Sequence, residues 1–433
     1  MLWIDLRFRE LRKGLGGALL LLLYGGCGLH ATAQPAADTS KWIQVRLHHQ
    51  TTIESAALSP NRGTMVVQLP GSGAPILKIT PADTIRLGRR ERDVYAKHDD
   101  AHLYGRAFHL VPTSEATWTL NVAAESTRTY TGSLHITPAD SGTGVQVVNR
   151  VRLPEYVASV VASEYGLDDQ AGTRAMAVVA RTYGLFSTKK RFDGEYDQVD
   201  GTASQVYRGV GVVTEAAREA ARATRGEILT YNGDPIQAVY FSSSGGHTAS
   251  NEDVWTNSDP IPYLRGKRDP YDRPSPYHRW SARVNRQALL QALSLHQNTS
   301  VNGFLLGDRS PNGRLRTIKI LRADDTTTEI EASTFRSVVN EGVKGTPLNS
   351  TWFDARRDGP VYVFEGRGHG HGVGLNQWGA HTMAKRGKSY REILKFYYTG
   401  VQIQQLDGTP ARPPVAQNPT TPAPDSTSPR IGW

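Results

Sequence analysis

The chain has 433 residues, of which 38% are hydrophobic, 21% charged and 8% aromatic, and this composition excludes a wholly disordered protein. The formal net charge of +9 favours an anionic partner such as a nucleic acid, an anionic lipid or a cell-wall polymer. The single cysteine, Cys27, excludes disulfides within the mature chain and cysteine-based zinc sites.

The first 33 residues predict a signal peptide. Basic residues precede an apolar run from Leu15 to Tyr24, and Ala31-Thr32-Ala33 matches the small-x-small pattern that signal peptidase cleaves. The run is shorter than the ~20 apolar residues that span a bilayer, so we expect no transmembrane segment in the mature chain. Cleavage after Ala33 predicts an exported protein of the periplasm or cell envelope. Lipidation of Cys27 is a minor alternative.

The charge of the mature chain bears on its partner. Cleavage removes four basic and two acidic residues, which lowers the formal net charge from +9 to +7. The sequence has no Lys/Arg-rich run interleaved with aromatic residues, and exported proteins rarely meet nucleic acid. We therefore expect a wall or envelope partner and no nucleic acid.

After a short linker at residues 34–40, alternating apolar and polar residues predict a strand-rich part from 41 to 150. Ile43, Val45 and Leu47 alternate with polar residues, and similar runs follow between Gly, Pro, Asn and Asp turns. These runs are Met65 to Leu69, Ile76 to Ile79, Trp118 to Val122 and Leu134 to Ile136.

From 151 to 280 the pattern predicts helices and a hairpin. Pro154 suits the first turn of a helix, and a second helix is expected from Gln170 to Ser187. A third helix is expected from Thr214, a good N-cap, to Gly226. The strands that flank residues 231–234, Tyr-Asn-Gly-Asp, predict a hairpin that leads into residues 238–241.

Residues 281–345 predict a mixed elaboration beside the cleft, with a helix from Arg283 to Leu293 and strands at 316–322 and 328–331. Residues 346–400 hold a His/Gly-rich loop and closing helices, the last of which opens with the capping box of Ser389 and Glu392. The Pro/Thr-rich residues 401–433 predict a disordered tail. We expect one dominant α+β domain over 41–400, with the strand-rich part packed on the helical part.

Glu164 is the most informative carboxylate. On a helix begun at Pro154 it continues the apolar stripe of Val157, Val160 and Val161, so we expect it to face the core or a cleft floor. A carboxyl held against apolar surface has a raised pKa and can donate a proton near neutral pH. The alternative is a buried ion pair with Arg181, because structural pairs outnumber catalytic acids.

Four segments complete a pattern with Glu164. They are Arg181-Thr182-Tyr183, the loop Ser204-Gln205-Val206-Tyr207-Arg208-Gly209, the segment from Tyr240 to Thr248, and Gly-His-Gly-His-Gly-Val-Gly-Leu-Asn-Gln-Trp-Gly-Ala at 368–380. In this order they resemble the stage II sporulation protein D family, which also contains the amidase enhancers of bacterial cell walls. The Gly/His stretch at 368–380 is the most specific part.

The resemblance implies a lytic transglycosylase that acts on peptidoglycan glycan strands, with Glu164 as acid/base and no cofactor. It implies substrate-binding or acid-orienting roles for Arg181, Tyr183, Gln205, Tyr207, Ser242, Ser244, His369, His371 and Gln377. We expect the last three to line one groove with Glu164. A noncatalytic wall-binding enhancer of a cell-wall amidase shares these motifs and remains an alternative.

Two departures from the family pattern affect the rim of the expected cleft. Met176 stands where a glutamine is common, and the loop from Gly166 to Asp169 is short. Some relatives bind zinc through cysteines near the segment that matches 240–248, where this chain has serines. A zinc of that kind is therefore not expected.

The histidines offer a rival hypothesis. His369 and His371, with His247 or His381, would supply imidazoles for a metal. The chain has no HExxH helix, so we expect substrate contacts or loop hydrogen bonds and no metal. The glycines do not predict a dinucleotide site, because only helices and a tail follow and no βαβ unit is completed. We expect them to let the backbone approach a sugar ring.

The four matched segments contain no acidic residue besides Glu164, whereas retaining and inverting glycosidases use two carboxylates. We therefore expect lytic cleavage between N-acetylmuramic acid and N-acetylglucosamine. Glu164 would protonate the glycosidic oxygen and then deprotonate the C6 hydroxyl, which leaves a 1,6-anhydro end. Asp168 and Asp169, on the next loop, keep hydrolysis with a second carboxylate as an alternative.

Overall fold

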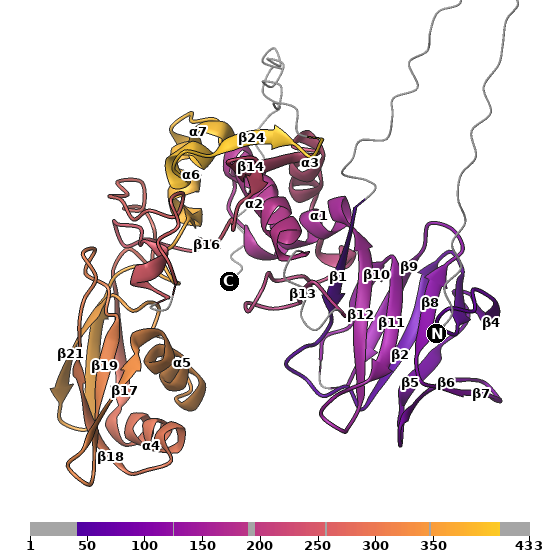
Figure 1. Cartoon of the computed structure of the whole chain (residues 1–433), viewed down its shortest axis with the longest axis horizontal. Coiled ribbons are helices and arrows are strands. Elements are labelled where there is room, and N and C mark those ends of the chain that lie inside the picture. Colours follow the sequence, from indigo (N-terminus) through magenta and orange to yellow (C-terminus); the bar gives the residue numbers. More distant parts are fainter. Residues whose placement is uncertain (1–40, 124, 189–194, 256–257, 346–347, 408–433) are drawn as a thin grey trace, which may run out of the picture. The chain divides into compact units, whose positions relative to one another are not determined.

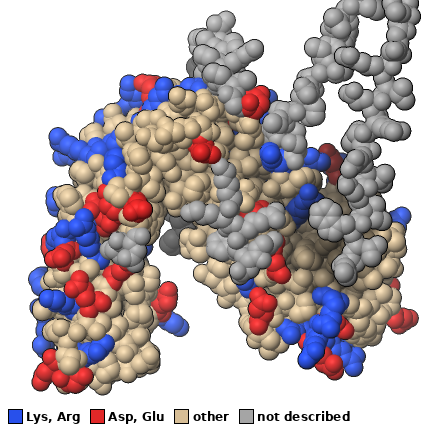
Figure 2. Space-filling model, in the orientation of Figure 1, with Lys and Arg blue, Asp and Glu red and all other residues tan. Residues whose placement is uncertain are grey.

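The computed structural model describes residues 41–123, 125–188, 195–255, 258–345 and 348–407 (Figure 1). The predicted signal peptide, the linker at 34–40 and the tail beyond residue 407 lie outside this part. Of the helices in the described residues, none combines the length and the apolar character that crossing a membrane requires. On the face in Figure 2, basic and acidic side chains are interspersed rather than gathered into one basic stripe.

The strand-rich part forms strands, as the alternation predicts, and these strands pair into two sheets. The strands are β1 (Trp42–Arg46), β2 (Ser55–Arg62), β3 (Met65–Gln68), β4 (Pro75–Ile79), β5 (Ile85–Arg90), β6 (Asp93–His98), β7 (Ala101–Gly105), β8 (Phe108–Pro112), β9 (Thr117–Val122), β10 (Arg128–Thr131), β11 (Ser133–Pro138), β12 (Val145–Arg152) and β13 (Gln198–Val199). The orders are β13-β1-β12-β11-β8-β3-β4 and β10-β9-β2-β5-β6-β7. Ile43 and Val45 are buried between half-buried neighbours, which confirms the two-residue period of β1.

The helical part follows. It comprises α1 (Leu153–Glu164), α2 (Gln170–Thr188), α3 (Glu215–Ala223), β14 (Glu227–Tyr231), β15 (Asp234–Pro235), β16 (Tyr240–Phe241), β23 (Leu375–Asn376), α6 (Gln377–Lys385), α7 (Tyr390–Tyr397) and β24 (Gln402–Gln405). Local signals set several boundaries: Pro154 lies in the first turn of α1, Thr214 caps Ala217 N, and the Ser389–Glu392 capping box is formed. Buried side chains of α1 and α2 belong to the same hydrophobic core as those of β1 and β12, so the expected packing of the two parts is confirmed.

The block after residue 280 has a second core of its own. Its elements are β17 (Trp280–Asn285), α4 (Arg286–Gln297), β18 (Val301–Leu306), β19 (Thr317–Arg322), β20 (Thr327–Glu331), α5 (Ala332–Gly342), β21 (Phe353–Asp358) and β22 (Val361–Gly366). They form the sheets β17-β22-β21 and β18-β19-β20. Because β21 and β22 complete the first of these sheets, the block extends to Gly366, beyond the expected boundary at residue 345.

Two further sequence expectations about the fold were wrong. The helix predicted from Arg283 begins at Arg286, because 280–285 pair with β22 and Asn285 caps Ala288 N. The chain after the His/Gly loop does not supply only helices and a tail. It returns as β24 and pairs antiparallel with β14, a long-range pairing that local composition does not reveal.

Candidate functional site

Glu164 is the last residue of α1. Its Oε1 accepts hydrogen bonds from Val206 N at 2.8 Å and from the Tyr240 hydroxyl at 3.1 Å. Its Oε2 accepts none from the residues that the structure describes. The side chain is half-buried, and burial raises its pKa above the ordinary value, although the two hydrogen bonds and the charge of Arg208 oppose this effect. The carboxyl can therefore hold or release a proton nearer to neutral pH than an exposed glutamate.

A directed chain of hydrogen bonds leads to this carboxyl. The Tyr156 hydroxyl donates to Gln205 Oε1 at 2.9 Å, and Gln205 Nε2 donates to the Tyr240 hydroxyl at 3.3 Å. The Tyr240 hydroxyl then donates to Glu164. Burial raises the pKa values of both tyrosines well above their ordinary value, so they remain neutral donors. Each bond polarises the next, which strengthens the contact that Glu164 receives.

The Gly/His loop reaches Glu164 through α6 and β16. Gln377 Nε2, in the first turn of α6, donates to the main-chain oxygen of Glu164 at 3.0 Å. β23 pairs parallel with β16, with Leu375 opposite Tyr240. Gln377 therefore contacts the backbone at Glu164, while its expected place in a substrate groove stays a prediction.

His371 connects the same loop to Tyr240. Its Nε2 donates to the main-chain oxygen of Tyr240 at 2.8 Å, and its Nδ1 accepts from Val373 N at 3.2 Å. The ring lies against Phe241 and Trp255, and burial lowers its pKa to about 4. His371 is thus a neutral imidazole of fixed tautomer, and both of its ring nitrogens are already used.

His369 differs from His371. Its ring contacts Tyr277 edge-on at 4.6 Å between centroids, and burial lowers its pKa to about 4. Its Nδ1 is buried and has no hydrogen-bond partner among the described residues. Because this nitrogen is buried, it is not open to a ligand, and the substrate-binding role expected for His369 stays a prediction.

The histidines do not converge on a metal site. His247 Nδ1 lies 2.7 Å from the main-chain oxygen of Thr248, and His381 Nδ1 lies 2.7 Å from Asp169 Oδ2. Within the described ranges, no group of three His, Cys, Asp or Glu side chains is placed to hold a metal ion.

Comparison with known proteins decides the family. Residues 141–231 match the family model described as Stage II sporulation protein. The chain is 32% identical over 286 residues to Stage II sporulation protein D of Bacillus subtilis, an alignment that covers 61% of this chain and 78% of the relative. The chain belongs to the stage II sporulation protein D family.

Other matches extend this assignment. An uncharacterized protein of Brachyspira hyodysenteriae is 34% identical over 280 residues, which cover 63% of this chain and 72% of that protein. The amidase enhancer of Bacillus subtilis is 28% identical over 281 residues, with 53% of this chain and 37% of the enhancer covered. Residues 264–374, which contain the block with the second core, match a family described as Domain of unknown function (DUF8618).

In this member of the stage II sporulation protein D family, four predicted substrate-binding residues are fully buried. They are Arg181, Gln205, Tyr207 and Ser244. A side chain without exposed surface does not touch a glycan, so the expectation of direct contact is corrected for these four. Tyr183 and Ser242 are half-buried, and their predicted roles stay predictions.

The buried residues hold the framework instead. Arg181 donates to the main-chain oxygens of Ala221 at 3.0 Å and Glu227 at 3.2 Å, which ties α2 to α3 and β14. The Tyr207 hydroxyl donates to Asn149 Oδ1 at 2.8 Å. Tyr207 thereby fixes the loop whose Gln205 and Val206 contact the Glu164 cluster.

The glycines of the loop make room for neighbouring atoms of the protein itself. The expectation that they make room for a sugar ring is wrong. At Gly372, with φ +90°, an added Cβ would lie 2.6 Å from the Arg314 guanidinium, and at Gly374, with φ +81°, 2.1 Å from the Val239 oxygen. Both conformations and both spaces require glycine. Arg314 donates to Gly370 O and Ser244 O at 3.3 Å each. Arg314 therefore holds the loop to the serine segment, residues 242–244.

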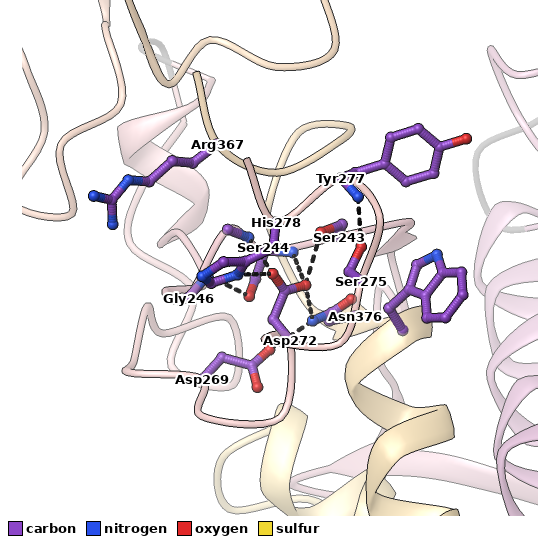
Figure 3. A network of polar contacts seen from close by, with 12 residues as sticks. Ser243, Ser244, Gly246, Asp269, Asp272, Ser275, Tyr277, His278, Arg367 and Asn376 are labelled. Atoms are coloured by element: carbon purple, nitrogen blue, oxygen red, sulfur yellow. Dashed lines mark hydrogen bonds and ion pairs between the residues drawn. The ribbon is translucent and has the colours of Figure 1, made fainter. Parts of the chain in front are cut away.

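Asp272 anchors the serine segment through several short hydrogen bonds (Figure 3). Its Oδ1 accepts from Ser243 Oγ, Ser244 N and Asn376 Nδ2, and its Oδ2 contacts Gly245 N and His278 Nδ1, all at 2.7–2.9 Å. Sequence reasoning missed Asp272, Tyr240 and Arg314. Tyr240 lies within a matched segment, so the resemblance held a signal for it, whereas none of the four segments contains Arg314 or Asp272.

Proposed function

We propose that the chain is an exported lytic transglycosylase that cleaves peptidoglycan glycan strands between N-acetylmuramic acid and N-acetylglucosamine. The observation that carries this proposal is the Glu164 carboxyl, which has a raised pKa, one oxygen held by neutral donors and the other without a partner in the described residues. Membership of a family whose members include an amidase enhancer supports a role at the cell wall.

The contacts of Glu164 suit a group that gives and then takes a proton. Glu164 Oε2 first protonates the glycosidic oxygen, and the bond from that oxygen to C1 of the muramic ring breaks. Val206 N and the Tyr240 hydroxyl then stabilise the carboxylate. That carboxylate removes the proton of the C6 hydroxyl of the same ring, the C6 oxygen bonds to C1, and the acid is regenerated. No water is consumed, and the product is a 1,6-anhydro end.

The placement of the neighbouring acids favours this route over hydrolysis. Asp169 accepts from Tyr165 at 2.8 Å and contacts His381 Nδ1 at 2.7 Å, and its side chain is 4% exposed. Asp168 is fully solvent-exposed. Hydrolytic glycosidases hold their second carboxylate opposite the first across the scissile bond, whereas these two are committed to structural contacts or to solvent.

A noncatalytic role as an amidase enhancer is the second candidate. The observation that favours it is the 28% identity to the amidase enhancer of Bacillus subtilis. An enhancer requires wall binding but no proton transfer by Glu164, so the two candidates differ in what Glu164→Gln does.

The test is digestion of purified peptidoglycan by the chain cleaved after Ala33, with mass spectrometry of the sugar ends in H₂¹⁸O. Anhydro ends without ¹⁸O support the proposal, and reducing ends with ¹⁸O would show hydrolysis. Glu164→Gln should lower cleavage about 10²- to 10⁴-fold, while Glu215→Gln, at an 86% exposed side chain on α3, should leave it unchanged. No cleavage by the wild type, together with stimulation of a purified cell-wall amidase, would favour the enhancer.

A further inference from the structure

An open cavity of about 460 Å³ lies at one end of the β17-β22-β21 sheet, in the block with the second core. Two tryptophans, Trp280 and Trp352, and two arginines, Arg279 and Arg367, contribute to its lining. The volume falls within the range of small-molecule sites, which is about 300–1,000 Å³. The cavity contains none of the residues that contact Glu164.

Glycines set the positions of both indoles. Trp280 pairs with Gly366 across β17 and β22, and a Cβ at Gly366 would lie 2.3 Å from Trp280 Cζ2. At Gly313, with φ +89°, a Cβ would lie 2.8 Å from Trp352 Nε1. Both tryptophans are half-buried. The backbone therefore supports two partly exposed aromatic rings at the cavity, a feature that a purely structural core does not need.

Outside one ion pair, the lining of the cavity also carries an excess of positive charge. Asp354, on its wall, is paired with Arg309 at 2.6 Å. Neither Arg279 nor Arg367 forms an ion pair with a described residue, and Glu365 is the remaining acid of the lining. The Arg367 guanidinium lies 5.4 Å from the Trp352 ring centroid, and in Figure 3 this side chain points away from the Asp272 network. A guanidinium beside an aromatic ring is suited to a ligand with both a carboxylate and an apolar face.

The cavity is connected by hydrogen bonds to the histidine loop. Arg367 N donates to Trp352 O at 2.9 Å, and the next residue, Gly368, donates from N to Tyr277 O at 2.8 Å. The Tyr277 ring contacts His369. The wall of the cavity thus continues directly into the loop that reaches Glu164 through Gln377.

We propose that this cavity is a binding subsite for an N-acetylated amino sugar that carries a carboxylate. The indoles cover the apolar face of the pyranose ring, and Arg279 and Arg367 bind the carboxylate. This inference rests on the proposed action on glycan strands, because it assigns one of their sugars to a second site.

The test measures binding by calorimetry to the full chain cleaved after Ala33, with Glu164→Gln introduced to prevent turnover. The probes are peptide-free N-acetylglucosaminyl-N-acetylmuramic acid and the neutral N-acetylglucosamine dimer. Arg367→Gln should weaken binding of the acidic disaccharide about 10- to 100-fold, the range for hydrogen bonds to charged groups, and leave the neutral dimer unchanged. Trp352→Ala should weaken both, and thermal unfolding checks that this variant is folded.

Two controls keep the test decisive. Arg279→Gln changes an exposed residue and should act in the same direction as Arg367→Gln without loss of fold, whereas Arg356→Gln, on β21 and outside the cavity lining, should have no effect. Equal binding of both probes to all arginine variants would overturn the proposal. So would binding of a free stem peptide, but of neither sugar, that depends on Arg367. Because binding is read without turnover, failure of the transglycosylase proposal leaves this result interpretable.

Discussion

The hydroxyl of Tyr240 donates to Oε1 of Glu164 over 3.1 Å, although 76 residues separate them in the sequence. The same residue accepts at its main-chain oxygen from His371 Nε2. Tyr240 is therefore the residue through which the Gly/His loop and the end of α1 are held in one arrangement. Its hydroxyl donates a hydrogen bond to Glu164, and its main-chain oxygen accepts one from the loop.

Tyr240→Phe separates these two roles, because it removes the hydroxyl and keeps the ring and the backbone. Loss of a donor to the ionised carboxyl should raise the pKa of Glu164 further. We expect cleavage of peptidoglycan to fall by about 10-fold, the size of one hydrogen bond to a charged group, and the pH–rate profile to move to higher pH. Tyr104→Phe, at an exposed tyrosine of β7, is the matched control. An unchanged profile would show that the Tyr240 hydroxyl does not tune Glu164.

Glu164→Gln should lower cleavage about 10²- to 10⁴-fold, as for loss of a general acid/base, and should also raise stability near neutral pH. The folded-state pKa of Glu164 is raised mainly by burial. A raised carboxyl pKa costs stability as pH rises from the unfolded value through the folded one, because the folded state holds its proton longer. The glutamine variant should therefore gain stability over the wild type at pH 7 and little at pH 4. Equal differences in unfolding temperature at both pH values would contradict this.

Local signals account for what the sequence predicts well. α1, α3 and α7 begin where Pro154, Thr214 and Ser389 indicate, because a cap or a proline acts within one helical turn. β24 and the start of α4 were missed because pairing with β14 and β22 over long sequence separations decides them. Strand pairing of this kind overrides local pattern.

The site residues, too, fall into those that the sequence identifies and those that only tertiary contacts reveal. Glu164 and Gln377 were identified from the stripe and the matched motifs, and the structure joins them. Burial could not be predicted for Arg181 and Tyr207, because motif membership does not distinguish a residue that binds substrate from one that supports its neighbours. Asp272 joins segments that are 28 and 104 residues away, so its role depends on tertiary contacts alone.

The two loop histidines predict acid sensitivity. Burial lowers the pKa values of His369 and His371 to about 4. In the unfolded chain both histidines have the ordinary pKa of about 6.5, so as pH falls they are protonated in the unfolded chain before they are protonated in the folded one. Their contribution to stability is therefore present above pH 6.5 and is lost as pH falls toward 4. Denaturant unfolding at pH 7, 5.5 and 4.5 should show this decline. The double variant H369Q/H371Q should flatten the pH dependence, and an equally steep decline in that variant would assign the effect to other groups.

Asp272→Asn should destabilise the chain more than any change of an exposed acid. The fully buried carboxylate accepts from two backbone N–H groups, a serine hydroxyl and an amide, and contacts His278. Asparagine turns one accepting oxygen into a donor, so N–H groups of the serine segment lose their partner inside the protein. We expect a loss of about 3–5 kcal/mol, as when one partner of a buried charged network is removed. Urea unfolding measures this loss, with Asp99→Asn, at an 87% exposed side chain, as the control.

If Asp272→Asn unfolds like the control, the serine segment does not depend on this carboxylate. If instead stability falls while the far-UV circular dichroism of the folded state is kept, peptidoglycan cleavage should fall with it, because Asn376, bound to Asp272, directly precedes Gln377 at Glu164.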